Sequence, residues 1–149
     1  MNDRYLFKAK RKNWKELPKE EWWVQGYLFD NGFVDDIRYF IGGLVIEEYK
    51  GTACDDWDIT GTNFYEIDDT TICQCTGVLD KRKNLIWEND IIKTEVGKAI
   101  VNWNHCAWRI KWLQDTVWRR DLWYWVKSDD WSVEVIGNIF DNPELLEAE

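Results

Sequence analysis

The stretch that decides the fold class, residues 74–93, reads Gln-Cys-Thr-Gly-Val-Leu-Asp-Lys-Arg-Lys-Asn-Leu-Ile-Trp-Glu-Asn-Asp-Ile-Ile-Lys. Two short apolar runs, 76–79 and 85–87, flank a polar loop, and this arrangement predicts a β-hairpin. Glu-Asn-Asp at residues 88–90 then predicts a sharp turn into a third strand, because Asn tolerates the left-handed conformation and an Asp side chain can cap a turn. The stretch therefore indicates a β protein with tight turns.

Apolar and polar residues alternate along much of the remaining chain. Between Trp108 and Trp112 every second residue is apolar and the residues between them are basic, which predicts an antiparallel strand with one buried face. Residues 122–126 are apolar on both faces, so we expect a strand that is fully buried or covered by a partner. Other strands are expected at residues 5–9, 23–29, 38–41, 44–49, 63–67, 71–75, 98–103 and 132–140.

Helical signals are short and few. Pro18 precedes a polar run that favours one or two helical turns, and Asn142 with Pro143 has the N-cap and first-residue chemistry of a short terminal helix. No flexible linker and no repeat interrupts the 149 residues. We therefore expect one mainly β, antiparallel domain over residues 1–149, with one or two short helices.

The acidic balance of the chain limits its partners. Its 28 acidic and 19 basic residues give a net charge of −9, which repels phosphate backbones and anionic lipid and disfavours direct nucleic-acid binding. The basic clusters at residues 8–19 and 81–83 lie beside acids, so we expect them to be solvated. The N-terminus has no apolar signal core, and no apolar window approaches about 18 residues. We expect a soluble cytoplasmic protein with no membrane contact.

No residue pattern predicts a catalytic, metal or cofactor site. The chain has four cysteines: Cys54, Cys73, Cys75 and Cys106. Their spacing differs from that of a zinc knuckle, so we expect free thiols in a reducing cytosol. His105 and Cys106 are neighbours on an expected hairpin, where neighbouring side chains point apart, so a nucleophile pair is not expected. The acidic cluster at residues 55–58 is the best candidate for an ion contact but lacks calcium-loop spacing. We expect a protein that is not an enzyme and has no cofactor.

Tryptophan is unusually frequent, with 12 residues in the chain. Four of them crowd near Arg119 and Arg120, a composition that is typical both of a core and of an interface. A fifth lies within residues 51–61, an acidic stretch expected to be a long loop and a contact surface. The candidate interaction residues are Trp57, Trp118, Trp123, Trp125 and Trp131.

Two blocks of sequence together match a known pattern. The first joins Tyr-Glu-Ile-Asp-Asp-Thr at residues 65–70 to residues 74–81 and 86–92. The second is Val-Ile-Gly-Asn-Ile-Phe-Asp-Asn-Pro-Glu-Leu-Leu at residues 135–146. In order and spacing, these blocks resemble the YopX-like proteins of phages and prophages. The resemblance implies a mostly β pseudo-barrel or sandwich carried by a mobile genetic element, and it brings no catalytic residues.

Two positions depart from the pattern of that family. Its members usually carry glycine where this chain has Lys83 and Asn89. Asn89 can take the conformation of glycine, whereas Lys83 costs on the order of 1 kcal/mol there unless the turn has another shape. Asp90 is expected to shape its turn, as the equivalent residue can in small SH3-like barrels, and not to catalyse a reaction. Neither departure threatens the fold.

Three functions compete at this point. The first is a non-enzymatic phage accessory protein that binds a host or phage protein in the cytoplasm of the bacterial host, as a homo-oligomer in one version of the hypothesis. The alternative is a nucleic-acid mimic that presents clustered acids to a nucleic-acid enzyme. A weaker third is a small enzyme or nucleic-acid binder that works through His105 or the basic turn at residues 81–83.

Overall fold

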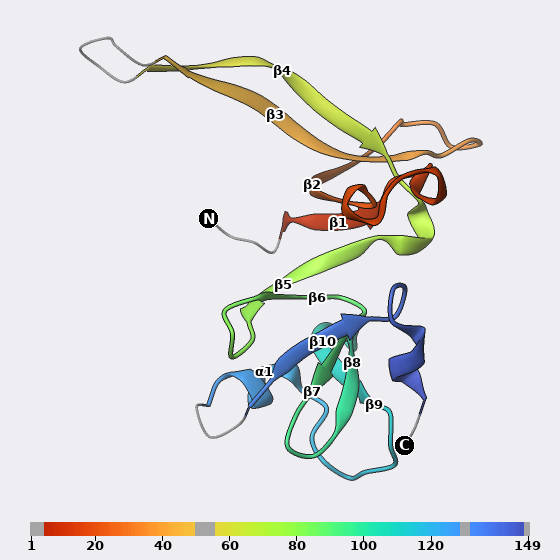
Figure 1. Ribbon diagram of the computed structural model, residues 1–149, viewed down its shortest axis with the longest axis vertical. Helices are drawn as coiled ribbons and strands as arrows, with labels where there is room; N and C mark the ends of the chain where they lie inside the picture. Colours follow the sequence, from red (N-terminus) through yellow and green to blue (C-terminus); the bar gives the residue numbers. More distant parts are fainter. Residues whose placement is uncertain (1–4, 50–55, 129–131, 148–149) are drawn as a thin grey trace. The chain divides into compact units, whose positions relative to one another are not determined.

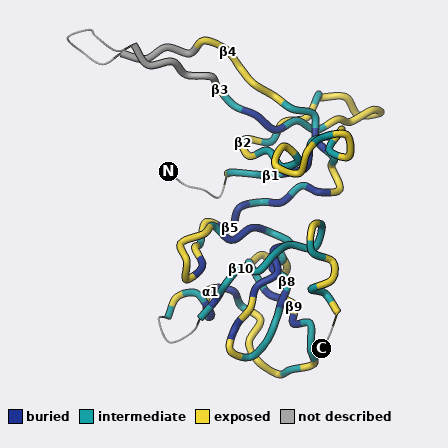
Figure 2. Tube along the Cα trace, in the orientation of Figure 1, coloured by how far each residue is buried: buried dark blue, intermediate teal, exposed yellow. Residues whose placement is uncertain are grey.

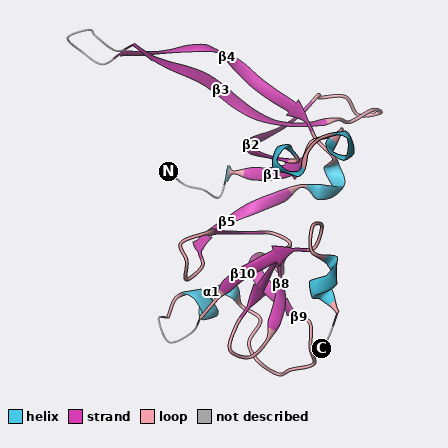
Figure 3. Cartoon of the chain, in the orientation of Figure 1, coloured by secondary structure: helices cyan, strands magenta, loops and turns pink. Residues whose placement is uncertain are grey.

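The computed structural model describes residues 5–49, 56–128 and 132–147, which form two compact units. Unit 1 comprises Met1–Tyr5 and Cys73–Glu149, and unit 2 comprises Leu6–Ile72. Strands dominate both units and the helices are short, as Figure 3 shows. The predicted mainly β, antiparallel class is confirmed, and the described strands close no barrel. A single domain over the whole chain stays a prediction.

Unit 2 is built on antiparallel strands in the order β4-β3-β2-β1 (Figure 1). The strands are β1 (Phe7–Lys10), β2 (Trp23–Asp30), β3 (Tyr39–Tyr49) and β4 (Asp56–Glu66). The short helices are η2 (Trp14–Glu16), η3 (Lys19–Glu21) and η4 (Asp69–Thr71). The buried core consists of Ala9, Ile41 and Ile67, and Phe7, Val24, Leu28, Tyr39 and Ile72 pack against it.

Strands β3 and β4 form a long hairpin with one irregularity in its register. The expected loop at residues 51–61 is therefore wrong for residues 56–61, which belong to β4. Thr60 and Thr62 favour a strand, and hydrogen bonding to β3 extends that strand into the acidic stretch. Residues 50–55 lie outside the described part of the chain.

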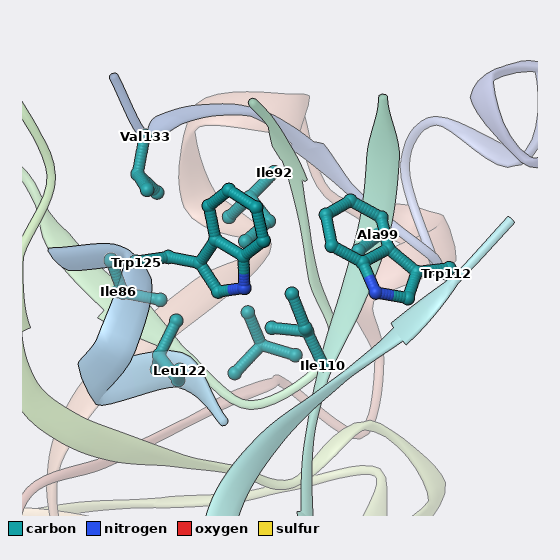
Figure 4. Close-up of a cluster of buried hydrophobic side chains, with 9 residues drawn as sticks. Ile86, Ile92, Ala99, Ile110, Trp112, Leu122, Trp125 and Val133 are labelled. Atoms are coloured by element: carbon teal, nitrogen blue, oxygen red, sulfur yellow. The ribbon is translucent and has the colours of Figure 1, made fainter. Parts of the chain in front are cut away.

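Unit 1 contains a sheet with the order β10-β7-β8-β9, and a β5–β6 hairpin. Its elements are β5 (Cys73–Leu79), β6 (Leu85–Trp87), β7 (Asp90–Lys93), β8 (Lys98–Asn104), β9 (Ala107–Trp112), α1 (Leu122–Val126), β10 (Glu134–Asn138) and η5 (Pro143–Leu146). The alternating apolar face of β9 meets α1 in one core, which Figure 4 shows in close-up and Figure 2 shows as buried chain. That core consists of Ile86, Ile92, Ala99, Val101, Ile110, Trp112, Leu122, Trp125 and Val133.

The strand expected at residues 122–126 is wrong, because this segment is the helix α1. Asp121 is its N-cap, and the Asp121 carboxylate accepts a hydrogen bond from the Tyr124 backbone N–H at 2.8 Å. Helical geometry brings Leu122 and Trp125 onto one buried face and turns Trp123 to solvent. A run that is apolar at every position fits either element by pattern, and the cap decides for the helix.

The C-terminal end is close to the prediction. The strand expected at residues 132–140 is shorter, because the Asn138 side chain accepts hydrogen bonds from the backbone N–H groups of Phe140 (3.0 Å) and Asp141 (2.9 Å) and turns the chain. The terminal helix is present as the 3-10 turn η5, with Asn142 at the N-cap position. The Asn142 side chain does not cap η5, and it accepts a hydrogen bond from the Asn138 N–H at 3.2 Å.

The turn at residues 88–90 has the predicted conformation, and at Lys83 the structure decides between the two turn shapes that the sequence left open. Lys83 and Asn89 both have left-handed backbones, with φ of 67° and 68°. The Asp90 carboxylate accepts a hydrogen bond from the Trp87 N–H at 2.8 Å, so Asp90 caps its turn. These residues shape the backbone, and Lys83 does so in a conformation that side chains rarely adopt.

Candidate functional site

The candidate tryptophans divide between core and surface. Trp125 is 0% exposed and packs edge-on against Trp112, so it belongs to the core of unit 1. Trp118 and Trp123 are 46% and 62% exposed, and their role in an interface stays a prediction. Trp131 and the side chain of Trp57 lie outside the described part of the chain.

Two buried indoles anchor the segment that follows β9. The Trp125 ring nitrogen donates to the Arg119 carbonyl at 2.9 Å, and the Trp112 ring nitrogen lies 3.3 Å from the carbonyl oxygens of Trp118 and Arg119. The Ile110 backbone N–H donates to the Arg120 carbonyl at 2.8 Å. These bonds hold residues 118–120 beside β9, so the two buried indole rings fix the backbone of this segment.

A second exposed apolar surface lies on the sheet of unit 2, and we call it the aromatic face. In the register, Tyr27 lies opposite Gly42 and Gly42 lies opposite Phe64, so the three positions form one row on one side of the sheet. Phe29 meets Phe64 edge-on, with ring centroids 5.1 Å apart. Phe29 and Phe64 remain 47% and 41% exposed. The members of the aromatic face are Tyr27, Phe29, Leu44 and Phe64.

The connection from β2 to β3 presents further apolar side chains. Asn31 closes this connection, because its side-chain amide donates to the Asp36 carbonyl at 2.9 Å and its side-chain oxygen accepts from the Arg38 N–H at 3.2 Å. Phe33 and Val34 project from the closed connection and are among its most exposed residues. The hydrogen bonds fix the ends of the connection that carries these apolar side chains.

The sequence reasoning missed the aromatic face. Its signal was present in residues 23–29. Tyr27 and Phe29 fall on one face of the strand, and the apolar Leu28 falls on the other. Such a strand has two apolar faces, and local sequence does not say which one the core covers. The packing of Val24 and Leu28 against the core of unit 2 settles that choice.

Unit 2 also contains a cage of three indole rings around one lysine. The Lys10 ammonium lies 4.0 Å, 4.4 Å and 5.6 Å from the ring centroids of Trp14, Trp22 and Trp23. Each ring attracts the cation through the negative face of its π-system. Lys10 is almost fully buried, so the cage of this protein is filled by its own side chain.

One carboxylate of unit 2 has a shifted pKa. Burial raises the pKa of Asp68, but several interactions outweigh burial and hold the pKa below its ordinary value of 3.8. They are hydrogen bonds from the Thr70 hydroxyl (2.7 Å), the Trp14 ring nitrogen (3.2 Å) and the Thr70 backbone N–H (3.2 Å), and the charge of Lys12. Asp68 thus holds η4 and the Trp14 ring of the cage in place.

The residues considered for chemistry lie apart or in turns. His105 and Cys106 form the β8–β9 turn with left-handed φ of 51° and 59°, and both are exposed. Cys73 and Cys75 are buried, whereas Cys106 is exposed. Among the described residues, no three His, Cys, Asp or Glu side chains gather closely enough to hold a metal ion. No helix in that part of the chain is long and apolar enough to cross a membrane.

Comparison with known proteins gives one decisive match. The sequence profile of the YopX protein family matches residues 27–147, which is most of the chain. The chain belongs to the YopX family. The match includes both sequence blocks of this YopX chain that resembled the family, so it confirms the predicted family.

Other comparisons add little to the family assignment. A crystal structure of protein EF1440 from Enterococcus faecalis is similar to this YopX chain, with 18% sequence identity, coverage of 96% of this chain and 97% of that chain, and a TM-score of 0.49. No curated protein matches the sequence.

Proposed function

We propose that this YopX protein is a non-enzymatic protein-binding module, carried by a phage or prophage and active in the cytoplasm of the bacterial host. The aromatic face of unit 2 carries the proposal. Exposed apolar side chains that adjoin one another on a rigid sheet favour association, because covering them removes apolar area from water. Tyr and Phe are also enriched at the centres of interfaces.

The surroundings of the aromatic face suggest the chemistry of the partner. Asp30 ends β2 beside it, and the exposed carboxylates of Asp35 and Asp36 lie in the connection to β3. A host or phage protein with an apolar centre and a basic rim would complement this arrangement, since opposite charges at a rim steer association. A second copy of the chain would bring the same acids against one another and is less favoured.

The proposal is tested with two matched sets of substitutions. Phe29→Thr combined with Phe64→Thr removes the ring pair and keeps strand propensity, whereas Trp123→Ala alters the exposed ring of α1. Circular dichroism first verifies that both variants fold. Cross-linking and pull-down from host cells should then recover a partner with the wild type and Trp123→Ala, and lose it with the double substitution.

Two results would contradict this assignment. Recovery of the same partner by the Phe29→Thr/Phe64→Thr variant places binding elsewhere, and loss with Trp123→Ala alone moves the interface to unit 1. Light scattering on the eluted wild type separates a heterologous partner from self-association, because a homo-oligomer forms without host protein.

A further inference from the structure

A polar groove of about 540 Å³ lies in unit 1, away from the aromatic face in sequence and in chemistry. Strands β8 and β9 and the segment after β9 line it. The groove side of β8–β9 is opposite the core face, because Asn102 pairs with Arg109 while the neighbouring Val101 and Ile110 are buried. The groove thus lies on the side of β8 and β9 that faces away from this core.

The groove concentrates positive charge in a protein with a net charge of −9. Arg109, Lys111 and Arg120 line it, against one acid, Asp115. Among the described ion pairs, the cations are Lys81, Arg82, Arg38 and Arg119, so none of these pairs uses a groove cation. Three cations against one acid around one cavity attract an anion, and guanidinium groups suit the oxygen geometry of phosphate.

The wall that carries Arg120 is held in place before binding. The Arg120 carbonyl accepts from the Ile110 N–H at 2.8 Å, and the preceding carbonyl of Arg119 accepts from the buried ring of Trp125 at 2.9 Å. Arg109 also forms a backbone bridge to Asp121. A preorganised wall lowers the conformational entropy that a ligand must overcome.

Asn102 provides a second and independent indication of a ligand. The Asn102 side chain lines the groove, and its oxygen, which has no accessible surface, has no hydrogen-bond partner within the described chain. Buried polar atoms are nearly always paired, so an unpaired one beside a cavity calls for a donor from outside the chain. The terminal torsion of an Asn side chain is soft, and its rotation would bring this oxygen to a ligand hydroxyl.

We infer that the groove binds a small phosphate monoester that carries hydroxyl groups, as sugar phosphates and mononucleotides do. The cations of Arg109, Lys111 and Arg120 hold the phosphate, and Asn102 accepts from a hydroxyl. This site is in unit 1 and is independent of the aromatic face, so either proposal stands if the other fails.

Isothermal titration calorimetry of the full chain tests the site with four probes: ribose 5-phosphate, adenosine monophosphate, inorganic phosphate and ribose. We expect binding of both monoesters, weaker binding of inorganic phosphate, and none of ribose. Tighter binding of adenosine monophosphate than of ribose 5-phosphate identifies a nucleotide, and not a sugar phosphate, as the ligand class. Arg109→Gln with Arg120→Gln should weaken the monoesters about tenfold or more, because each loses a charge-assisted contact.

Asn102→Ala separates the two parts of the site. It should weaken ribose 5-phosphate and leave inorganic phosphate unchanged, since in the proposed site the cations hold the phosphate and only the sugar reaches Asn102. Arg38 is an exposed cation of unit 2 that pairs with Asp36, so Arg38→Gln is the matched control. This variant should bind the monoesters like the wild type. Absence of monoester binding at millimolar concentration, or equal binding by the Arg109→Gln/Arg120→Gln variant, would overturn the inference.

Discussion

Removal of the Asp80 carboxylate should strongly destabilise unit 1. Asp80 is buried at the β5–β6 turn, where one carboxylate oxygen accepts from the backbone N–H groups of Arg82 and Asn84, both at 2.9 Å. Its other oxygen accepts from the Val135 N–H of β10 at 3.1 Å. One side chain therefore closes a turn and ties that turn to a strand distant in sequence.

The magnitude follows from these three bonds. A hydrogen bond to a charged group contributes about 1.5–3 kcal/mol, but the two turn donors can reach water after truncation and lose less. We expect Asp80→Ala to lower the free energy of unfolding of unit 1 by about 3–5 kcal/mol. Asp80→Asn should cost about half as much, because its oxygen can serve the turn while its NH₂ group faces the Val135 N–H.

The exposed pairs beside Asp80 do not replace it. Lys81 and Arg82 contact Glu134 at 3.4 Å and 2.9 Å, but the side chains of both cations are largely solvated. Ion pairs of this kind contribute about 0–1 kcal/mol. The turn is therefore linked to the β10 segment by two bonds, from the Val135 N–H to the Asp80 carboxylate at 3.1 Å and from the Lys81 N–H to the Val133 carbonyl at 2.9 Å.

Hydrogen exchange measured by mass spectrometry suits this prediction, because it reports opening segment by segment. In Asp80→Ala, the peptides that cover β6–β10 should lose protection, while those of unit 2 keep it. Glu147→Ala removes the same charge from an exposed position and is the control. A loss below about 1 kcal/mol, or a change as small as that of Glu147→Ala, would refute the assigned role.

Three further predictions concern single residues. Lys83→Gly should raise the free energy of unfolding by up to about 1 kcal/mol in urea titrations, because it relieves a left-handed lysine; Asn89→Gly should change it less, and equal effects would contradict the argument. Lys10→Ala should empty the indole cage and lower the Tm. Tetramethylammonium should raise the Tm of the variant but not that of the wild type, because the emptied cage can bind this cation. An equal effect on both proteins would show that the cage does not hold a cation. Because the folded pKa of Asp68 lies below the unfolded value, its carboxylate stabilises the chain above that value and the gain is lost as the pH falls through the folded pKa. Acid titration of Asp68→Asn should therefore lack part of the stability loss below about pH 4 that the wild type undergoes, and superimposable acid curves would contradict this.

The sequence could predict what local chemistry determines. The turn at residues 88–90 follows from short-range rules, so the positive φ of Asn89 and the capping role of Asp90 were accessible without a structure, whereas at Lys83 the family pattern left two turn shapes open. The helix α1 was missed although its cap was visible. Asp121 stands directly before the apolar run, and this signal was given less weight than the apolar pattern.

What the sequence could not supply depends on contacts between distant segments. The β4 strand extends into an acidic stretch because β3 pairs with it, and the aromatic face is exposed because the core takes the other side of β2. The groove exists because residues 118–120 fold back along β9. No window of local sequence contains these relations.

The tryptophans show why composition alone does not separate a core from an interface. Their crowding at residues 118–131 was typical of both, and in the structure Trp112 and Trp125 bury their rings and direct their ring nitrogens to the carbonyls that position Arg120. An indole is large enough to fill a core and has one donor that can fix a loop at the edge of that core. Here aromatic side chains support a polar groove from behind, while the exposed apolar surface with a defined register lies on the sheet of unit 2. Substitutions in the two units should therefore separate protein binding from anion binding in one chain.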